Sequence, residues 1–193
     1  MKANRRNTKK QFKELSLRPI ERKDLRLLRK WKNDSTARRS VGDGTRTFSE
    51  EDMERWFERT EALIDRDRRW IVVEGGRPVG FVGLYGIDLT RRHAEIGILL
   101  DSGARGRGIG REATWLVFDE AFNMLNLHRL YLHVLSDHRI AQKMYKRCGF
   151  RDEGRLRQHN FKAGRYVDVI VMGILASEHA AQHREEGRKR SPR

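Results

Sequence analysis

The chain has 193 residues, of which 37% are hydrophobic and 36% charged, and its formal net charge is +15. This length suits one domain with its own core and is short for two. No apolar run approaches the ~18 residues of a membrane span, and the basic first residues lead into no apolar segment of a secretory signal. The single cysteine, Cys148, excludes an internal disulfide and fits a reducing cytosol, so we expect a cytoplasmic protein.

Part of the positive charge lies in the two ends of the chain. Residues 1–14 and 176–193 are rich in charge and poor in large apolar residues, so we expect flexible tails on either side of one domain over residues 15–175. Two interpretations of the tails stay open, namely solvated ends or electrostatic contact with a ribosome or RNA. A nucleic-acid-binding module is the alternative class of function, although the sequence has no helix-turn-helix, zinc-ligand or RNP-like aromatic pattern.

The first half of the domain is predicted to mix helices with strands. A strand over residues 15–20 precedes a charged helix with apolar residues at helical spacing. A second helix begins after Ser49, which is followed by three acidic residues as at a capped N-terminus. Residues 70–87 then predict a hairpin that turns at Gly75-Gly76.

The second half continues the alternation. A strand over residues 93–101 leads into a glycine-rich loop and a helix, and residues 129–135 predict another strand. A short helix ends at Gly149. A closing hairpin turns at Ala163-Gly164.

The loop SGARGRGIGREATW, residues 102–115, holds four glycines and three arginines. Its GIGREA portion fits the dinucleotide pattern G-x-G-x-x-A, but four strands precede it and three of them are joined as hairpins, which disagrees with a doubly wound fold. No G-K-[ST] follows, which excludes a P-loop. Glycine amides and a helix N-terminus favour an anion, and Arg105, Arg107 and Arg111 add full charges. A pyrophosphate fits this combination.

RGRGIG, residues 105–110, is similar to the Q/R-x-x-G-x-G/A signature of the GNAT superfamily of N-acetyltransferases, where this loop binds the pyrophosphate of acetyl-CoA. AQKMYKRCGF, residues 141–150, resembles the A-x-x-x-Y-x-x-x-G-F element of the same superfamily. The opening and closing segments look like the RimJ/RimL-like branch, which includes ribosomal-protein and polyamine acetyltransferases. The resemblance covers residues 15–175. It implies a single α/β (α+β) domain with flanking helices and a mixed, mostly antiparallel sheet of about seven strands, whose fourth and fifth strands splay apart to admit the pantetheine arm.

The resemblance also implies acetyl-CoA as co-substrate, no metal, and direct attack of a neutral amine on the thioester. Main-chain groups at the end of the fourth strand and in the loop are implied to hold acetyl-CoA, and one N–H can stabilise the oxyanion. These residues are Ile98, Leu99, Leu100, Arg105, Gly106, Arg107, Gly108, Ile109 and Gly110. Many relatives have Asn where this chain has His138, which supplies a hydrogen bond but not the same donor–acceptor pair.

Tyr145 matches the general acid of the family. A phenol with pKa about 10 stays protonated at neutral pH and can give its proton to the departing thiolate. Glu95, on the same strand face as Gly97, could take the amine proton directly or through water. His133 on the partner strand is the other candidate base, because histidine as a residue type has an unperturbed pKa of about 6.5 and suits proton transfer near neutral pH. Whether Glu95, His133 or neither is the base stays open, and Cys148 is expected in the core.

The acceptor is the least determined part. Candidate pocket residues lie in the helical insert or at strand ends: Asn33, Trp56, Tyr85, Asp88, Asn160 and Tyr166. We expect a protein N-terminal α-amine, because its pKa of about 8 leaves a usable neutral fraction and because the net charge favours a ribosomal setting and opposes a polyamine. A polyamine, an amino sugar or an aminoglycoside is the alternative, and a homodimer stays open.

Overall fold

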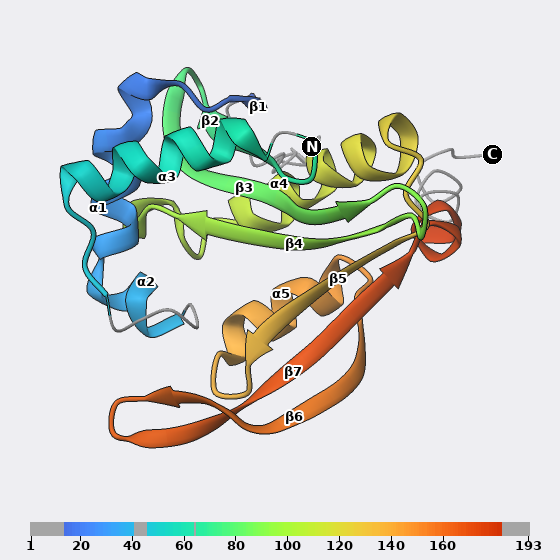
Figure 1. Ribbon diagram of the computed structural model, residues 1–193. Helices are drawn as coiled ribbons and strands as arrows, with labels where there is room; N and C mark the ends of the chain where they lie inside the picture. The colour runs from blue at the N-terminus through green and yellow to red at the C-terminus, as the bar shows by residue number, and fades with distance from the viewer. Residues whose placement is uncertain (1–13, 41–45, 64, 183–193) are drawn as a thin grey trace, which may run out of the picture.

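The structure is a computed structural model that describes residues 14–40, 46–63 and 65–182 (Figure 1). Its centre is a seven-stranded sheet in the order β1-β2-β3-β4-β5-β7-β6. Every neighbouring pair is antiparallel apart from β4 and β5, which are parallel. The predicted mixed, mostly antiparallel sheet is therefore confirmed.

The elements follow the predicted order. The strands are β1 (Leu15–Pro19), β2 (Arg68–Glu74), β3 (Arg77–Asp88), β4 (His93–Leu100), β5 (Arg129–Leu135), β6 (Arg151–Lys162) and β7 (Arg165–Leu175). The α-helices are α1 (Leu25–Asn33), α2 (Ser35–Ser40), α3 (Glu50–Ala62), α4 (Ile109–Phe118) and α5 (Arg139–Arg147). Short 3-10 turns lie at Arg22–Asp24 and Ser102–Ala104, and α4 continues as a π-helical segment over Asp119–Met124. The sequence did not predict α2, because six residues are too few to show helical periodicity.

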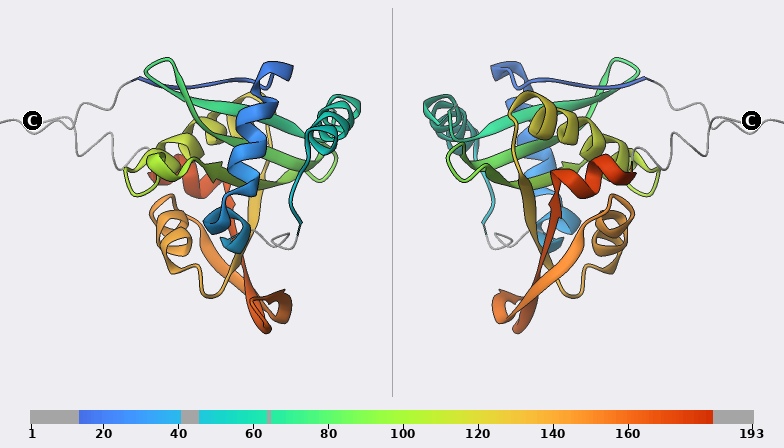
Figure 2. Two further views of the ribbon diagram at one scale, coloured as in Figure 1. Left: turned by 90° about the vertical axis from the view of Figure 1, so that its left-hand side faces the viewer. Right: turned by 90° about the vertical axis from the view of Figure 1, so that its right-hand side faces the viewer.

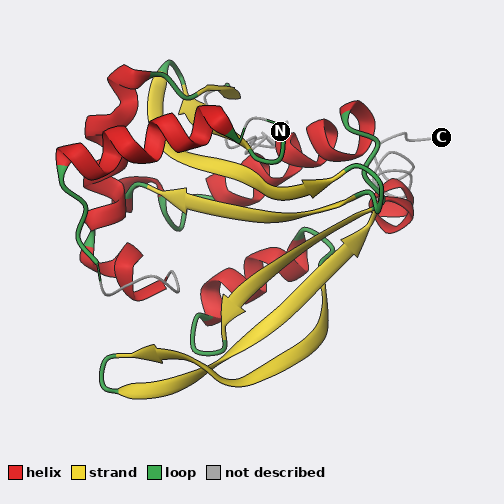
Figure 3. Cartoon of the chain, in the orientation of Figure 1, coloured by secondary structure: helices red, strands yellow, loops and turns green. Residues whose placement is uncertain are grey.

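The helices cover opposite faces of the sheet (Figures 2 and 3). On one face α1 and α3 pack through Leu28 and Met53 against Ile71 and Phe81 of the sheet. On the other face α4 contributes Val117 to the larger core, which also receives α5. No helix in the described ranges combines the length and the apolar character needed to cross a membrane. A site at the sheet can therefore lie in one of two different environments. One is under α1 and α3, and the other is under α4 and α5.

The strands β4 and β5 pair over a short stretch only. Their register joins His93 to Arg129, Ala94 to Leu130 and Glu95 to Tyr131, and no pairing follows (Figure 1). Beyond that point β4 stays with β3 and β5 stays with β7. The two strands diverge like a V, so the facing edges of residues 96–100 and 132–135 have main-chain groups without a partner across the gap. This is the splayed pair that the resemblance implied.

The domain continues past the boundary expected at Leu175. Residues 176–182 are helical, and the His179 ring lies 4.8 Å from the ring of Phe118, between centroids. Glu178 forms an ion pair with Arg151 at 2.9 Å. Packing of an aromatic side chain, which composition alone does not reveal, holds this segment to α4. The remaining tail residues, 1–13 and 183–193, lie outside the described residues.

Candidate active site

The glycine-rich loop turns into α4 through two glycines with left-handed backbone. Gly106 has φ 72° and Gly108, at the N-cap of α4, has φ 90°. Side chains other than glycine rarely adopt this conformation. Ile109 is buried and anchors the first turn in the core. The N–H groups of Arg111 and Glu112 already donate to the carbonyl oxygen of Gly108. Helix geometry leaves those of Ile109 and Gly110 without an intrahelical acceptor, so they form an anion-binding end of the helix.

The three loop arginines each lie beside a carboxylate. Arg107 bonds Glu74 at 2.6 Å, and Arg111 lies 3.3 Å from Glu112. Arg105 donates to Asp34 at 3.0 Å and to the carbonyl oxygen of Leu100. Each guanidinium keeps further donors, but the neighbouring acids cancel part of the positive charge. The backbone amides and the helix end therefore contribute more to the attraction of this loop for an anion than the arginine-rich sequence indicates.

The two candidate bases form one pair across the gap between β4 and β5. Glu95 Oε1 lies 2.9 Å from His133 Nδ1. Both side chains are half-buried, with exposed fractions of 36% and 39%. A neutral imidazole that donates from Nδ1 to this carboxylate presents Nε2 as a proton acceptor. The sequence indicated the two residues as alternative bases. In the structure they contact each other where the pairing of β4 and β5 ends.

Tyr145 lies on α5 and is buried, with its ring centroid 5.5 Å from that of Phe150. Burial raises the pKa of its phenol well above the usual range, and the charges of Cys148, Tyr85 and Glu95 add to this effect. The hydroxyl therefore carries its proton at every working pH.

His138 stands at the N-cap of α5, where its backbone N–H donates to the carbonyl of Leu135. Burial lowers the pKa of its imidazole, Lys162 and Arg105 lower it further, and Asp137 opposes them. The ring is therefore neutral at pH 7 and offers one donor and one acceptor.

Cys148 is fully buried, as expected, and burial raises the pKa of its thiol to about 12. Because the thiolate is the reactive form, we expect native protein at pH 8 to resist iodoacetamide and denatured protein to react at once. Mass spectrometry of the alkylated cysteine checks this. Fast alkylation of the native chain would contradict a purely structural role.

On the α3 side of the sheet, Tyr85 lies flat over a pair of glycines. A Cβ on Gly83 would lie 2.8 Å from the Tyr85 hydroxyl, and a Cβ on Gly97 would lie 3.1 Å from its ring. The Arg69 guanidinium lies 4.9 Å from the centroid of this ring. Tyr85 pairs in register with Glu95, so the ring forms a floor beside the candidate base.

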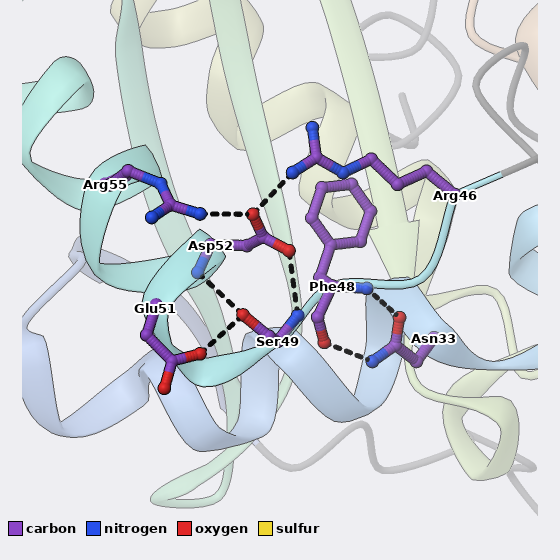
Figure 4. A network of polar contacts seen from close by, with 7 residues as sticks. All are labelled: Asn33, Arg46, Phe48, Ser49, Glu51, Asp52 and Arg55. Carbon is purple, nitrogen blue, oxygen red and sulfur yellow. Dashed lines mark hydrogen bonds and ion pairs between the residues drawn. The ribbon is translucent and has the colours of Figure 1, made fainter.

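Asn33 fixes the loop before α3 (Figure 4). Its side chain donates to the carbonyl oxygen of Phe48 at 2.9 Å and accepts from the Phe48 N–H at 2.8 Å. The side chain of Ser49 accepts from the N–H of Asp52, and the carboxylate of Asp52 accepts from the N–H of Ser49, which confirms the predicted cap. Asn33 also borders a cavity of about 320 Å³ beside Arg105.

The other acceptor candidates are dispersed. Trp56 is half-buried on α3, and its ring lies 6.4 Å from that of Phe81, between centroids. Asp88 binds the backbone and the guanidinium of Arg91 at the β3–β4 turn. Asn160 and the exposed Tyr166 lie on the β6–β7 hairpin, beyond the edge of β5. The structure brings Trp56 and Tyr85 to the face that carries Glu95, whereas Tyr166 is exposed on the hairpin.

The sequence analysis missed three residues on that face: Lys32, Phe48 and Arg69. Lys32 lies over three aromatic rings, and the Arg69 guanidinium lies between Tyr85 and Trp56. Sequence patterns could not find them, because the rings come from a loop, a helix and a strand that only the fold brings together. Within the described ranges, no group of three or more His, Cys, Asp or Glu residues is arranged to hold a metal ion.

The family profile described as acetyltransferase (GNAT) domain matches residues 14–151. Spermidine N(1)-acetyltransferase of Escherichia coli (strain K12) is 32% identical over 179 residues, 90% of this chain and 92% of that protein. The enzyme of the same name from Vibrio cholerae serotype O1 is 32% identical over 173 residues, 86% of this chain and 95% of that protein. The crystal structure of spermidine N-acetyltransferase from Vibrio cholerae in complex with CoA and spermine superposes with a TM-score of 0.80 at 32% identity, covering 86% of this chain and 98% of that chain. The chain therefore belongs to the GNAT acetyltransferase family and is an N-acetyltransferase.

Proposed function

We propose that this enzyme transfers the acetyl group of acetyl-CoA to a primary amine of a polyamine. The observation that carries the reaction is the Glu95–His133 pair across the splayed strands, and Tyr145, whose phenol stays protonated, matches the general acid of the family. The observation that carries the acceptor is the similarity to spermidine N-acetyltransferases over nearly the whole of both chains.

In this proposal the gap holds the pantetheine arm, and the amides after Gly108 hold the pyrophosphate. A main-chain N–H at residues 98–100 of β4 polarises the thioester carbonyl. The neutral amine attacks the carbonyl carbon, so a C–N bond forms and the C–S bond breaks. The amine proton passes to the Glu95–His133 pair, and Tyr145 supplies a proton to the sulfur.

The comparisons favour the small-molecule alternative over the protein N-terminus that we expected from the net charge. A global charge of +15 is a weak guide to one pocket, since part of it belongs to the terminal segments outside the described residues. A polyamine amine with pKa near 10 also needs a base more than an α-amine does, because little of it is neutral at pH 7. The polar pair in the gap fits this need. The RimJ/RimL-like branch stays a prediction.

An acceptor panel tests the proposal. With acetyl-CoA in excess, we expect turnover of spermidine and spermine to exceed that of ribosomal-protein N-terminal peptides, amino sugars and aminoglycosides by about 100-fold in kcat/KM. Product mass identifies the acetylated amine. Fast turnover of the peptides with none of the polyamines would reject the polyamine and restore the α-amine.

The base pair makes a separate prediction. If the two side chains act as one unit, Glu95→Gln and His133→Gln each lower kcat by about tenfold to 100-fold, and the double variant is no slower than the slower single variant. A double-mutant cycle on kcat at fixed pH measures this. Additive losses would show that the two residues act independently, and an unchanged kcat in both would show that neither is the base.

A further inference from the structure

The ammonium of Lys32 lies inside a cage of three aromatic rings. Its Nζ lies 4.9 Å from the ring centroid of Trp56, 5.1 Å from that of Phe48 and 5.5 Å from that of Phe81. An ammonium within about 6 Å of a ring centroid is attracted by the negative face of the ring, and cages of several rings recognise alkylated ammonium groups. The protein thus contains a formed ammonium site, and one of its own side chains occupies it.

The cage walls are fixed from several sides. Asn33 holds the backbone of Phe48 with two hydrogen bonds (Figure 4). Trp56 lies on α3, the helix that Ser49 caps. Its ring packs edge to face against that of Phe81, with an interplanar angle of 67°. Phe81 is buried in the sheet. The Lys32 side chain can move more easily than the three rings, because it is half-buried at the end of α1 and lysine has a flexible four-carbon stem.

The cage lies on the same sheet face as the candidate base, at a distance that suits a linear amine. Phe81 pairs with Leu99 and Tyr85 pairs with Glu95, and residues of the same parity on a strand share a face. Four residues along β3 therefore separate the cage wall from the position beside Glu95, about 13 Å. An extended chain advances roughly 1.2 Å per bond, so the terminal nitrogens of spermidine lie about 11 Å apart. The remaining ~2 Å is within the reach of the contacts, because an ammonium is attracted to a ring centroid from about 5 Å away, so a polyamine can reach both places at once.

We propose that the cage formed by Phe48, Trp56 and Phe81 binds the distal ammonium of the acceptor, and that Lys32 is an internal competitor that the acceptor displaces. This inference rests on the proposed polyamine acceptor. A cage of rings attracts a cation without needing an acidic partner, so it binds the far end of a polyamine on a face where Lys32 and Arg69 already supply positive charge. Occupation by Lys32 weakens acceptor binding and leaves the acetyl transfer step unchanged.

Removing the ammonium of Lys32 tests the competition. Lys32→Met keeps the apolar stem, so we expect the KM for spermidine to fall by about threefold to tenfold while kcat and the KM for acetyl-CoA stay unchanged. Lys23→Met is the matched control. It removes the same charge from an exposed residue paired with Glu21, so the KM stays that of the wild type. An unchanged or raised KM for spermidine in Lys32→Met would overturn the proposal.

A ligand that cannot be acetylated tests the cage without the reaction. Butyltrimethylammonium, followed by calorimetry, should bind Lys32→Met more tightly than the wild type. Adding Phe48→Leu, which removes a ring but keeps an apolar side chain, should weaken that binding by about threefold or more. Thermal unfolding of each variant verifies the fold. If butyltrimethylammonium bound Lys32→Met equally well with and without Phe48→Leu, the cage would be excluded as a binding site, even where polyamine turnover is intact. If the cage bound this ligand but the enzyme did not acetylate polyamines, only the proposed polyamine acceptor would be rejected.

Discussion

Tyr145→Phe should lower kcat by about 100-fold or more and leave the affinity for acetyl-CoA within about twofold. The variant keeps the buried ring against Phe150 and removes the hydroxyl alone. Burial raises the pKa of this phenol, so the group is present as a donor throughout the working range and can support the sulfur as the C–S bond breaks. Steady-state rates with calorimetry of acetyl-CoA binding separate the two quantities.

Tyr131→Phe is the matched control for this variant. Tyr131 pairs in register with Glu95, and its ring lies 5.8 Å from that of His133, between centroids. Burial raises the pKa of its phenol, and the charge of Glu95 adds to this effect. Because Tyr131 stands on β5 and not on the helix that carries the family motif, we expect the kcat of Tyr131→Phe to lie within about threefold of that of the wild type. Weakened acetyl-CoA binding with an unchanged kcat in Tyr145→Phe would instead make Tyr145 a residue that positions the cofactor.

Gly108→Val should abolish measurable acetyl-CoA binding, a loss of about 100-fold or more in affinity. Gly108 has φ 90° at the start of α4, and a β-branched residue strains that conformation by about 1–3 kcal/mol. The loop can relieve the strain only by turning the helix-end amides away from the pyrophosphate, and the new side chain also blocks the approach of the anion. Calorimetric titration with acetyl-CoA measures the loss.

Gly164→Val is the control that distinguishes damage to the acetyl-CoA site from a general loss of stability. Gly164 has φ 79° in the β6–β7 turn, and a Cβ there would meet nothing within 4 Å, so the substitution carries similar backbone strain far from the loop. We expect a lower melting temperature in both variants and normal acetyl-CoA affinity in Gly164→Val. Equal loss of affinity in both would show that general destabilisation explains the effect.

The order of elements was predictable because local signals determine it. The cap at Ser49, the turn at Ala163-Gly164 and the end of α5 at Gly149 each depend on backbone preferences of a few neighbouring residues. The anion-binding loop was predictable for the same reason. A helix as short as α2 and the helical residues 176–182 were missed, since tertiary packing and not periodicity stabilises them.

The residues of the candidate site were easier to predict from the sequence than the contacts between them. Glu95 and His133 lie 38 positions apart, and their pairing depends on how far β4 and β5 separate. The pairing of the loop arginines with acids depends likewise on segments distant in sequence, as with Arg107 and Glu74. The aromatic cage of Phe48, Trp56 and Phe81 was the least predictable, because its walls come from a loop, a helix and a strand. The net charge led us to expect an α-amine, whereas the comparisons favour the polyamine alternative, and a net charge averages over the whole chain.

A crystal structure of the enzyme with CoA would show where the cofactor and the candidate catalytic groups meet. We predict the pantetheine arm between residues 96–100 of β4 and residues 132–135 of β5, with the pyrophosphate at the amides that follow Gly108 and the sulfur within hydrogen-bonding reach of the Tyr145 hydroxyl. CoA bound outside this gap, or with its sulfur remote from both Tyr145 and the Glu95–His133 pair, would contradict it.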